Sequence, residues 1–380
     1  AVRFLHMPRI NSFRAFMLTG GLLLAAFPSG SEAWGEMTGK PPIRKGCAII
    51  VTDDDIPSGS ATAGALFVED AGIGKRLLTG DVLATALGFL EAGVRCIDVI
   101  DSHDGAVDPQ PLREIGVPVL TPSNTENWTW PFLGPMENEY SVAALIGFHS
   151  NAGVAGFRPH TMNDSIKSLE IDGNKAGEVA HLIIGLGALD VPVGIVSGDM
   201  NATEEGGLWA SQVEKVTVRW FASDGKPMFL SSSTAAMELR RAAVRAVQTP
   251  KDPYRPREPM HITLATYSRE LMRDRVKTMG KKWRQAARKR RSGPGLPGAI
   301  DFGFGSMSTV EGNTVSWKAS SAELAFVTIA FAASHLRGPE NWAIVSRGYS
   351  AYQTGRYRKA IDDYGKALRQ NPYDIATRCR

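Results

Sequence analysis

The chain has 380 residues, 43% of them hydrophobic and 22% charged, which is ordinary for a globular protein with one large or two moderate domains. Its formal net charge of +4 is mild, and its three cysteines are too few for a disulfide framework or a thiolate zinc site. Two of them, Cys47 and Cys96, also lie in apolar runs typical of buried strands. Any metal must therefore be held by carboxylates and by some of the seven histidines.

The N-terminus has the pattern of a secretory signal. Arg9 and Arg14 precede a mostly apolar stretch at 15–27, and Ser31 and Ala33 place small residues where a signal peptidase cleaves. The apolar stretch is short for a membrane span, so we predict a cleaved signal peptide over 1–33 and a periplasmic or secreted mature protein. An uncleaved membrane tether is the alternative.

From residue 46 to about 335, short apolar runs alternate with helical patterns, which predicts an α/β fold with a mostly parallel sheet and crossover helices. The predicted strands are 47–52, 96–100, 141–148 and 191–196, and the helices between them are 81–92 and 175–186. Residues 102–140 are rich in Pro, Asn and Trp and are expected to form loop with short elements. A helix at 239–247, a strand at 261–267 and a buried helix at 319–333 predict a second α+β part of the same unit.

A basic stretch follows between Arg273 and Arg291, where ten Lys and Arg are opposed only by Asp274. Such a run suits nucleic acid, anionic lipid or cell-wall polymer. Trp283 is its only aromatic residue, so base stacking is poorly supported. We interpret the stretch as a solvated helix face leading into a loop, and expect no nucleic-acid partner.

The C-terminal segment 341–374 differs in kind from the rest. Its pattern matches one tetratricopeptide helix-turn-helix repeat, carried by Trp342, Gly348, Tyr352, Gly355, Tyr357, Ala360, Tyr364, Ala367 and Pro372. One repeat cannot bury its own apolar face, so this segment must pack on the catalytic unit, on another subunit or on further repeats. It is a candidate surface for a protein partner, and an ordinary helical hairpin is the alternative.

Polar side chains fall where the predicted strands end. Because the carboxyl ends of parallel strands share one edge of the sheet, these groups are expected to converge there. Carboxylate oxygens and neutral imidazoles suit zinc or a similar divalent ion. Asp53 and Asp55 are two residues apart and face the same side of an extended chain, so they are candidates to hold one metal or to bridge two. The groups are Asp53-Asp54-Asp55, Asp101-Ser102-His103, His149 and Asp199.

Five short motifs in one order make the chain resemble the bacterial D-aminopeptidase family first associated with dipeptide-transport operons. Eleven residues separate His149 from His160, and eighteen separate His160 from Glu178, which also resembles the family. The resemblance spans about 46–333 and omits the signal, much of the basic stretch and the tail. The motifs are Asp53-Asp54-Asp55-Ile56-Pro57-Ser58-Gly59, Asp101-Ser102-His103, Gly147-Phe148-His149-Ser150, Pro159-His160-Thr161-Met162 and Gly177-Glu178-Val179.

The resemblance implies a metallopeptidase domain over 46–335, with His160 as the catalytic residue acting as acid, base or nucleophile. It also implies an aminopeptidase for short, D-alanyl-containing peptides that assembles as a ring-shaped homo-oligomer. The family has Glu where this chain has Asp55, so that position departs from the pattern. Two zinc ions are implied, with the ligands Asp53, Asp55, His103, His149 and Glu178.

Several assignments stay open at the level of sequence. Asp199 is a candidate to bind the substrate α-amine, but capping of the next helix explains it equally well. Glu178 and His181 share a helix face at a spacing found in carboxylate-bridged metal sites, yet His181 is better read as a packing residue. The alternative functions are a metal-dependent amidase or esterase acting on cell-wall fragments, and an inert exported scaffold that uses the C-terminal repeat.

Overall fold

The computed structural model describes residues 46–53, 71–125, 132–249, 251–267, 309–335 and 354–370, together with residues 269, 272, 276, 344, 347, 348, 351 and 352. The predicted signal peptide, Asp55 and the basic stretch other than Val276 lie outside this part of the chain. No described helix combines the length and apolar character needed to cross a membrane.

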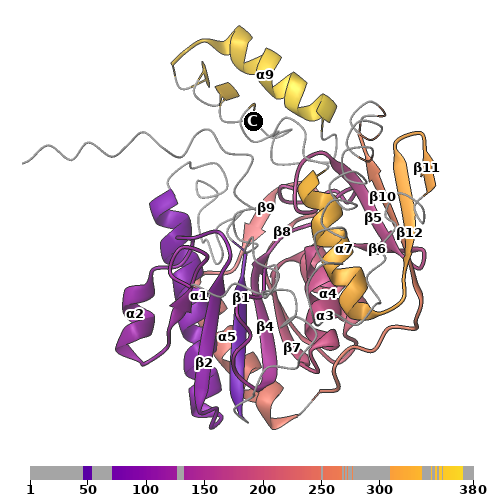
Figure 1. The fold of residues 1–380 in the computed structure, drawn as a ribbon. Coiled ribbons are helices and arrows are strands. Elements are labelled where there is room, and N and C mark those ends of the chain that lie inside the picture. The colour runs from indigo at the N-terminus through magenta and orange to yellow at the C-terminus, as the bar shows by residue number, and fades with distance from the viewer. Residues whose placement is uncertain are drawn as a thin grey trace, which may run out of the picture.

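The main feature is a seven-stranded sheet with the strand order β3-β2-β1-β4-β7-β8-β9 (Figure 1). All neighbouring strands are parallel except β9, which runs antiparallel to β8. The sheet is therefore the mostly parallel one predicted from the sequence. Its strands are β1 (Cys47–Thr52), β2 (Cys96–Asp101), β3 (Val119–Leu120), β4 (Tyr140–Phe148), β7 (Val193–Asp199), β8 (Glu214–Phe221) and β9 (Pro227–Phe229).

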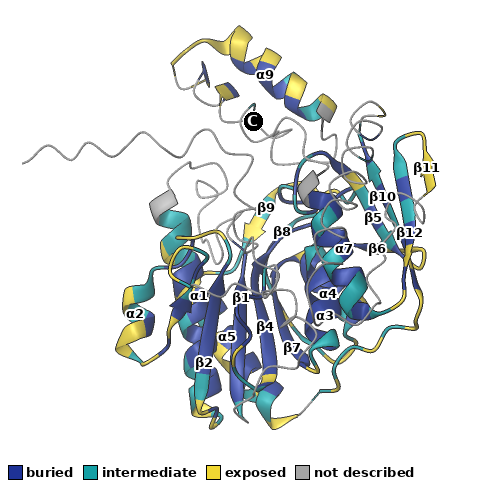
Figure 2. Ribbon diagram, in the orientation of Figure 1, coloured by how far each residue is buried: buried dark blue, intermediate teal, exposed yellow. Residues whose placement is uncertain are grey.

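Helices cover both faces of this sheet, which explains why its central strands are buried throughout (Figure 2). Alternate residues of β1 point to opposite faces, so Ile49 and Val51 join one core and Ala48 and Ile50 the other. The second core includes residues of α1 (Ala71–Glu91), α2 (Pro109–Glu114) and α5 (Ser232–Gln248). The first core includes residues of α3 (Glu178–Ala188) and α4 (Met200–Trp209).

A second, five-stranded sheet extends the first core. Its neighbours are all antiparallel and follow the order β11-β12-β10-β5-β6. The helix α7 (Ala322–His335) packs close to α3, because Gly185 leaves room for the ring of Phe326, which would lie 2.5 Å from an added Cβ. This is the predicted α+β part. Its strands are β5 (Ile166–Ile171), β6 (Asn174–Ala176), β10 (Met260–Thr266), β11 (Thr309–Glu311) and β12 (Thr314–Ala319).

The predicted elements are found, with differences at their boundaries. The helix predicted at 81–92 begins at Ala71, ten residues earlier. Its first part contains Gly72, Gly74 and Gly80, which lower helix propensity, and tertiary packing overrides that preference. The first residues of the helix predicted at 175–186 belong to β6, and α3 begins only at Glu178.

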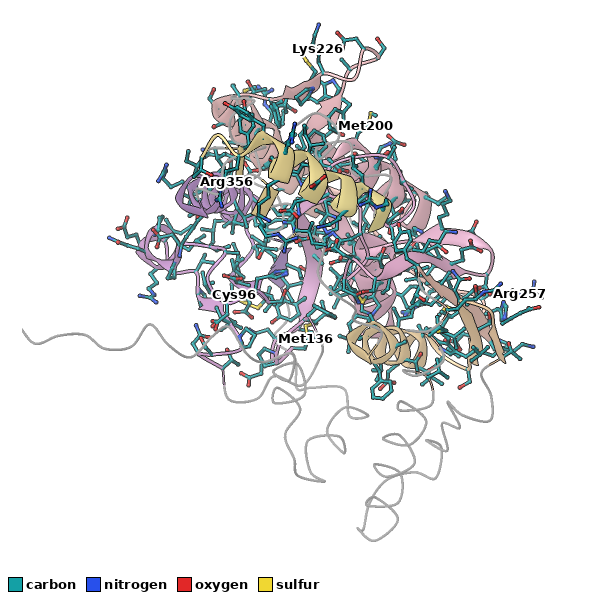
Figure 3. All side chains as sticks on the ribbon, turned by 90° about the horizontal axis from the view of Figure 1, so that it is seen from above. Cys96, Met136, Met200, Lys226, Arg257 and Arg356 are labelled. Carbon is teal, nitrogen blue, oxygen red and sulfur yellow. A yellow bond between two sulfur atoms is a disulfide. The ribbon has the colours of Figure 1, made fainter. Side chains whose placement is uncertain are left out.

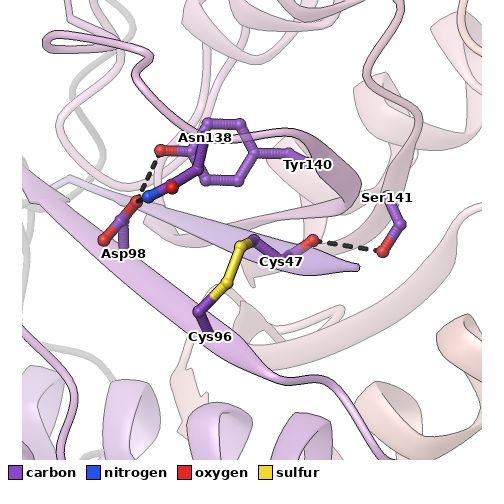
Figure 4. The surroundings of a disulfide bond; sticks show 6 residues. All are labelled: Cys47, Cys96, Asp98, Asn138, Tyr140 and Ser141. Atoms are coloured by element: carbon purple, nitrogen blue, oxygen red, sulfur yellow. Dashed lines mark hydrogen bonds between the residues drawn. A yellow bond between two sulfur atoms is a disulfide. The ribbon is translucent and has the colours of Figure 1, made fainter. Parts of the chain in front are cut away.

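Cys47 and Cys96 form a single disulfide, a pairing that the sequence did not predict (Figure 4). The two residues are directly opposed at the start of the parallel strands β1 and β2, with their Cα atoms 4.6 Å apart. That separation lies within the normal disulfide range. One bond does not make a disulfide framework, and apolar surroundings say nothing about which residue faces a cysteine across the sheet.

The C-terminal segment contains the helix α9 (Tyr357–Gln370), and the described residues between 344 and 352 are also helical. Ala351, Ala360 and Tyr364 pack in a small separate core. Asp363 is buried beside them and accepts two hydrogen bonds from the Arg347 guanidinium, which holds the pKa of Asp363 below its usual range. These contacts fit a helical hairpin, and the tetratricopeptide assignment stays a prediction.

Exposed charged residues occupy the rim of the molecule when it is viewed from above. Lys226, in the turn between β8 and β9, and Arg257, ahead of β10, both project from the periphery (Figure 3). Among the described residues, Arg219 is the only Lys or Arg that is buried. Buried carboxylates are more numerous, and several of them gather where β1, β2, β4 and β7 end.

Candidate metal centre

The first two groups of the site follow β1 and β4, which are neighbours in the sheet. Asp53 comes directly after β1, and its amide donates to the carbonyl of Ile146 in β4. His149 comes directly after β4. Both side chains are buried, and His149 Nε2 lies 3.2 Å from Asp53 Oδ2. The strand register therefore delivers one carboxylate and one imidazole to the same point.

Two further groups reach this point from other elements. Glu178 is the first residue of α3, and its Oε1 lies 3.5 Å from His149 Nε2 and 3.7 Å from His160 Nε2. The His149 and His160 rings stack with their centroids 4.1 Å apart. The amide of Met162 donates to Glu178 Oε1 at 2.6 Å, which fixes the carboxylate. One ligand atom each from His149, His160 and Glu178 fits within a span of 4.8 Å.

The backbone sets the tautomer of both histidines. His149 Nδ1 lies 2.9 Å from the carbonyl oxygen of Ser150, and His160 Nδ1 lies 2.8 Å from that of Arg158. A carbonyl only accepts, so each Nδ1 carries the proton, and the Nε2 of a neutral ring presents a lone pair. Both lone pairs face carboxylate oxygen. Such a meeting of acceptors requires a cation between them, either a second ring proton or a metal ion.

The spacing of these atoms suits zinc. Zinc binds nitrogen and oxygen at about 2.0–2.2 Å, so ligand atoms at the corners of its tetrahedron lie about 3.3–3.5 Å apart. The distances from His149 Nε2, 3.2 Å to Asp53 and 3.5 Å to Glu178, match that edge. Imidazole nitrogen and carboxylate oxygen are donors that zinc commonly takes. The residues present therefore fit a divalent ion.

His103 lies in the exposed loop after β2. It lines a cavity of about 20 Å³ together with Asp53 and Glu178. That volume is roughly room for one water molecule or ion. Three of the five predicted ligands thus line one space, and a fourth, His149, lies 3.2 Å from Asp53. The fifth, Asp55, lies outside the described residues, and His160 belongs to the cluster of His149 and Glu178.

Comparison with known proteins gives the family of the chain. A model of the D-aminopeptidase family matches residues 64–289, which is more than half of the chain. The chain belongs to the D-aminopeptidase family. No curated protein sequence matches it significantly.

A solved structure supports the fold of this D-aminopeptidase family member. It is described as the Zn-dependent D-aminopeptidase DppA from Bacillus subtilis, a self-compartmentalizing protease. The two chains are 17% identical with a TM-score of 0.55, and the similarity covers 77% of this chain and 99% of the other. At that identity the likeness establishes the fold, and family membership places the chain among peptidases.

Two buried aspartates, Asp101 and Asp199, hold the loops that carry His103 and His149. The Asp101 carboxylate accepts the amides of His103, Gly105 and Val107, so it shapes the loop after β2. Asp199 accepts the amide and hydroxyl of Ser150, next to His149, and also the amide of Ala202 at the start of α4. Asp199 is thus a helix cap and a loop anchor, which supports capping over the alternative of α-amine binding.

Two more supporting residues have no motif of their own. Arg219 is fully buried in β8 and donates to the carbonyls of Gly147 and Phe148, at the end of the strand that carries His149. Glu205 in α4 is buried, and burial raises its pKa. Its apolar surroundings give a usable sequence signal, because Ala202, Glu205 and Trp209 share the buried face of α4 at helical spacing.

His181 is a packing residue, as the sequence interpretation held. Its ring stacks on Phe326 at 4.2 Å, and its Nε2 donates to the Phe326 carbonyl at 2.8 Å. Burial lowers the pKa of His181 to about 4, so the ring is neutral at physiological pH. With its Nε2 proton committed to a carbonyl, His181 supports the helix that carries Glu178.

Proposed function

We propose that the chain is an exported, zinc-dependent aminopeptidase that removes N-terminal residues from short peptides, D-alanyl peptides in particular. Family membership supports the peptidase activity, and the zinc-dependent structural relative supports the metal. The observation that carries the proposal is the convergence of His149 Nε2, His160 Nε2 and Glu178 Oε1 beside Asp53. A cation bound among these groups would stabilise the arrangement, because imidazole nitrogen and carboxylate oxygen each offer it an electron pair.

Asp53, His149 and Glu178 would hold the metal, with His103 and Asp55 completing a second position for a pair of zinc ions. When bound, zinc polarises the scissile carbonyl and lowers the pKa of a water toward neutrality. The protein's own task is to orient both imidazoles and fix their tautomer, which the Ser150 and Arg158 carbonyls do by accepting from Nδ1. Their burial also keeps bulk water from competing for the ligand atoms.

His160 would handle the proton. Its Nδ1 is committed to Arg158, so Nε2 is the atom that accepts a proton from the attacking water and returns it to the departing amine. Asp53 and Glu178 stabilise the imidazolium that forms in between, since Glu178 Oε1 lies 3.7 Å from that nitrogen. This assigns His160 an acid-base role instead of a nucleophilic one.

Export and assembly belong to the same proposal. A disulfide between Cys47 and Cys96 is stable outside the reducing cytoplasm, which supports a periplasmic or secreted protein. The structural relative is described as self-compartmentalizing, which supports a homo-oligomer here. A protein partner for the C-terminal segment is also proposed, on the repeat pattern alone.

One experiment on the purified full chain tests the activity. Zinc content is measured alongside hydrolysis of D-alanyl-D-alanine, L-alanyl-L-alanine and an N-acetylated D-alanyl dipeptide. We expect bound zinc, faster release from the D-peptide and no cleavage of the acetylated one, because an aminopeptidase requires a free α-amine. Cleavage of the acetylated substrate would indicate an amidase instead, and a folded, zinc-loaded protein that cleaves none of the three would indicate an inert scaffold.

A further inference from the structure

The helix α3 begins with an unusual cap. Glu178 is its first residue, and the residue before it, Gly177, has no side chain with which to cap the helix. The first amides of a helix lack partners inside the helix, and a side-chain oxygen normally accepts from them. Here the cap must come from elsewhere in the chain, at the very residue that presents a metal ligand.

Glu205 of the neighbouring helix α4 supplies the cap. Its Oε1 accepts the amide of Gly177 at 2.6 Å and the amide of Ala180 at 2.9 Å. These two amides flank Glu178 in the chain. The carboxylate therefore fixes the backbone on both sides of the ligand, and its negative charge is favourable at a helix N-terminus.

The other oxygen of Glu205 reaches the loop that carries His149. Asn151 Nδ2 donates to Glu205 Oε2 at 2.9 Å, and Asn151 lies two residues after His149. A Cβ added to Gly177 would lie 2.4 Å from the Asn151 Cβ and 2.8 Å from Glu205 Oε2. The absence of a side chain at Gly177 is therefore what allows the two ligand-bearing segments and Glu205 to meet.

We infer that Glu205 is a positioning residue for the metal centre, which holds Glu178 and the His149 loop at the separation that a zinc ion requires. The inference rests on the proposed function. Glu204, the residue before Glu205, is exposed and pairs with Lys215 at 2.9 Å on the surface. Of these two adjacent glutamates, only Glu205 can therefore hold the metal-binding segments in position. Burial raises the pKa of Glu205, and nearby Glu178 adds to this effect.

The test measures zinc affinity by competition with a chelator, and thermal unfolding of the metal-free protein, in a set of variants of the full chain. Glu205→Ala removes the cap and the link to Asn151, and we expect a 10- to 100-fold loss of zinc affinity, the usual effect of removing a group that orients a ligand. Glu204→Gln is the matched control and should bind zinc like the wild type.

A reciprocal exchange covers the case in which Glu205→Ala does not fold. Glu205→Gln keeps an acceptor for the amides of Gly177 and Ala180 but places its own NH₂ group against the NH₂ group of Asn151. Asn151→Asp places a second carboxylate against that of Glu205. Each change alone should weaken zinc binding, whereas the double variant restores a donor-acceptor pair and the original net charge. We expect the double variant to bind zinc within about threefold of the wild type, far tighter than additive effects of the two changes would give.

The outcomes distinguish a failure of the proposed zinc-dependent function from a failure of the positioning role inferred for Glu205. If the wild type binds no zinc, the proposed function fails before Glu205 is considered. If the wild type binds zinc but Glu205→Ala binds it equally well, with only a lower unfolding temperature, Glu205 is a structural cap and the inference is wrong. Additive effects in the Glu205→Gln and Asn151→Asp cycle would also overturn it.

Discussion

The two ends of β1 show how one strand serves two purposes. At its amino end, Cys47 is joined to Cys96, and nearby Asp98 Oδ2 accepts hydrogen bonds from the Tyr140 hydroxyl and from Asn138 (Figure 4). Burial and Asp98 raise the pKa of Tyr140, so its hydroxyl remains a donor. Every polar group named here meets a complementary one.

At the carboxyl end of the same strand the matching is different. Asp53 faces the His149 Nε2 lone pair, which also faces Glu178, so three acceptors meet. At the amino end each of these groups has a complementary partner, whereas at the carboxyl end the proposed cation would join the acceptors. We therefore expect the amino edge to contribute mainly stability and the carboxyl edge to carry the proposed activity, so that changes at the two edges should have separable effects.

The largest effect is expected from His149→Ala. The change removes the imidazole that lies close to both Asp53 and Glu178, leaving their carboxylates without it. We expect loss of zinc and a fall in peptide turnover beyond the roughly 10² to 10⁴ that removal of a proton-transfer group gives. Zinc should no longer raise the unfolding temperature, because metal binding is coupled to folding. A variant that keeps its zinc and turnover would place the metal centre elsewhere.

His160→Ala tests whether His160 transfers protons while His149 binds the metal at the carboxyl edge. If His160 transfers protons and does not hold the metal, the variant should retain zinc and lose turnover by roughly 10² to 10⁴. Metal content measured beside turnover distinguishes it from His149→Ala, which loses both. His160 Nε2 is 3.7 Å from Glu178 and belongs to the same cluster, so a metal-free variant would show that it is a ligand.

At the amino edge, Cys47→Ala combined with Cys96→Ala should reduce stability without reducing activity. The disulfide closes a loop across a sequence separation of 49 residues, and removal of such a bond typically costs about 2–4 kcal/mol of unfolding free energy. Denaturant unfolding measures this loss, and the reduced wild type is the control that should match. Peptide turnover should stay within about threefold, under roughly 0.7 kcal/mol of barrier. A tenfold fall in the folded variant would contradict the separation of the two edges.

The sequence was most informative where an apolar run that forms a strand is followed directly by a polar candidate site residue. The alternating runs located β1, β2, β4 and β7, and the residues that end them identified Asp53, His103 and His149. The disulfide could not be read from the sequence, because strand register decides whether Cys47 faces Cys96. The helical spacing of α4 marks Glu205 as a residue on its buried face, but its role as a cap could not be read, since that depends on α4 lying against the start of α3, a contact between segments 28 residues apart.

The smallest effect concerns His181, which tests whether the residue beside the metal centre is only structural. Burial holds its pKa at about 4, below the usual value near 6.5, so the unfolded chain takes up this proton first as pH falls. The stability that His181 contributes is therefore complete above about pH 6.5 and is lost as pH falls toward 4.

His181→Phe keeps the stack on Phe326 and removes the titrating group. Between pH 7.5 and 5, the metal-free wild type should lose about 2 kcal/mol more unfolding free energy than the variant, as the two pKa values imply. Denaturant unfolding at both pH values measures this difference, and zinc must be removed first because metal binding adds its own pH dependence. Equal losses in the two proteins would mean that the pKa of His181 in the fold is close to its unfolded value, and His181 would then be a candidate participant in the chemistry proposed for the carboxyl edge.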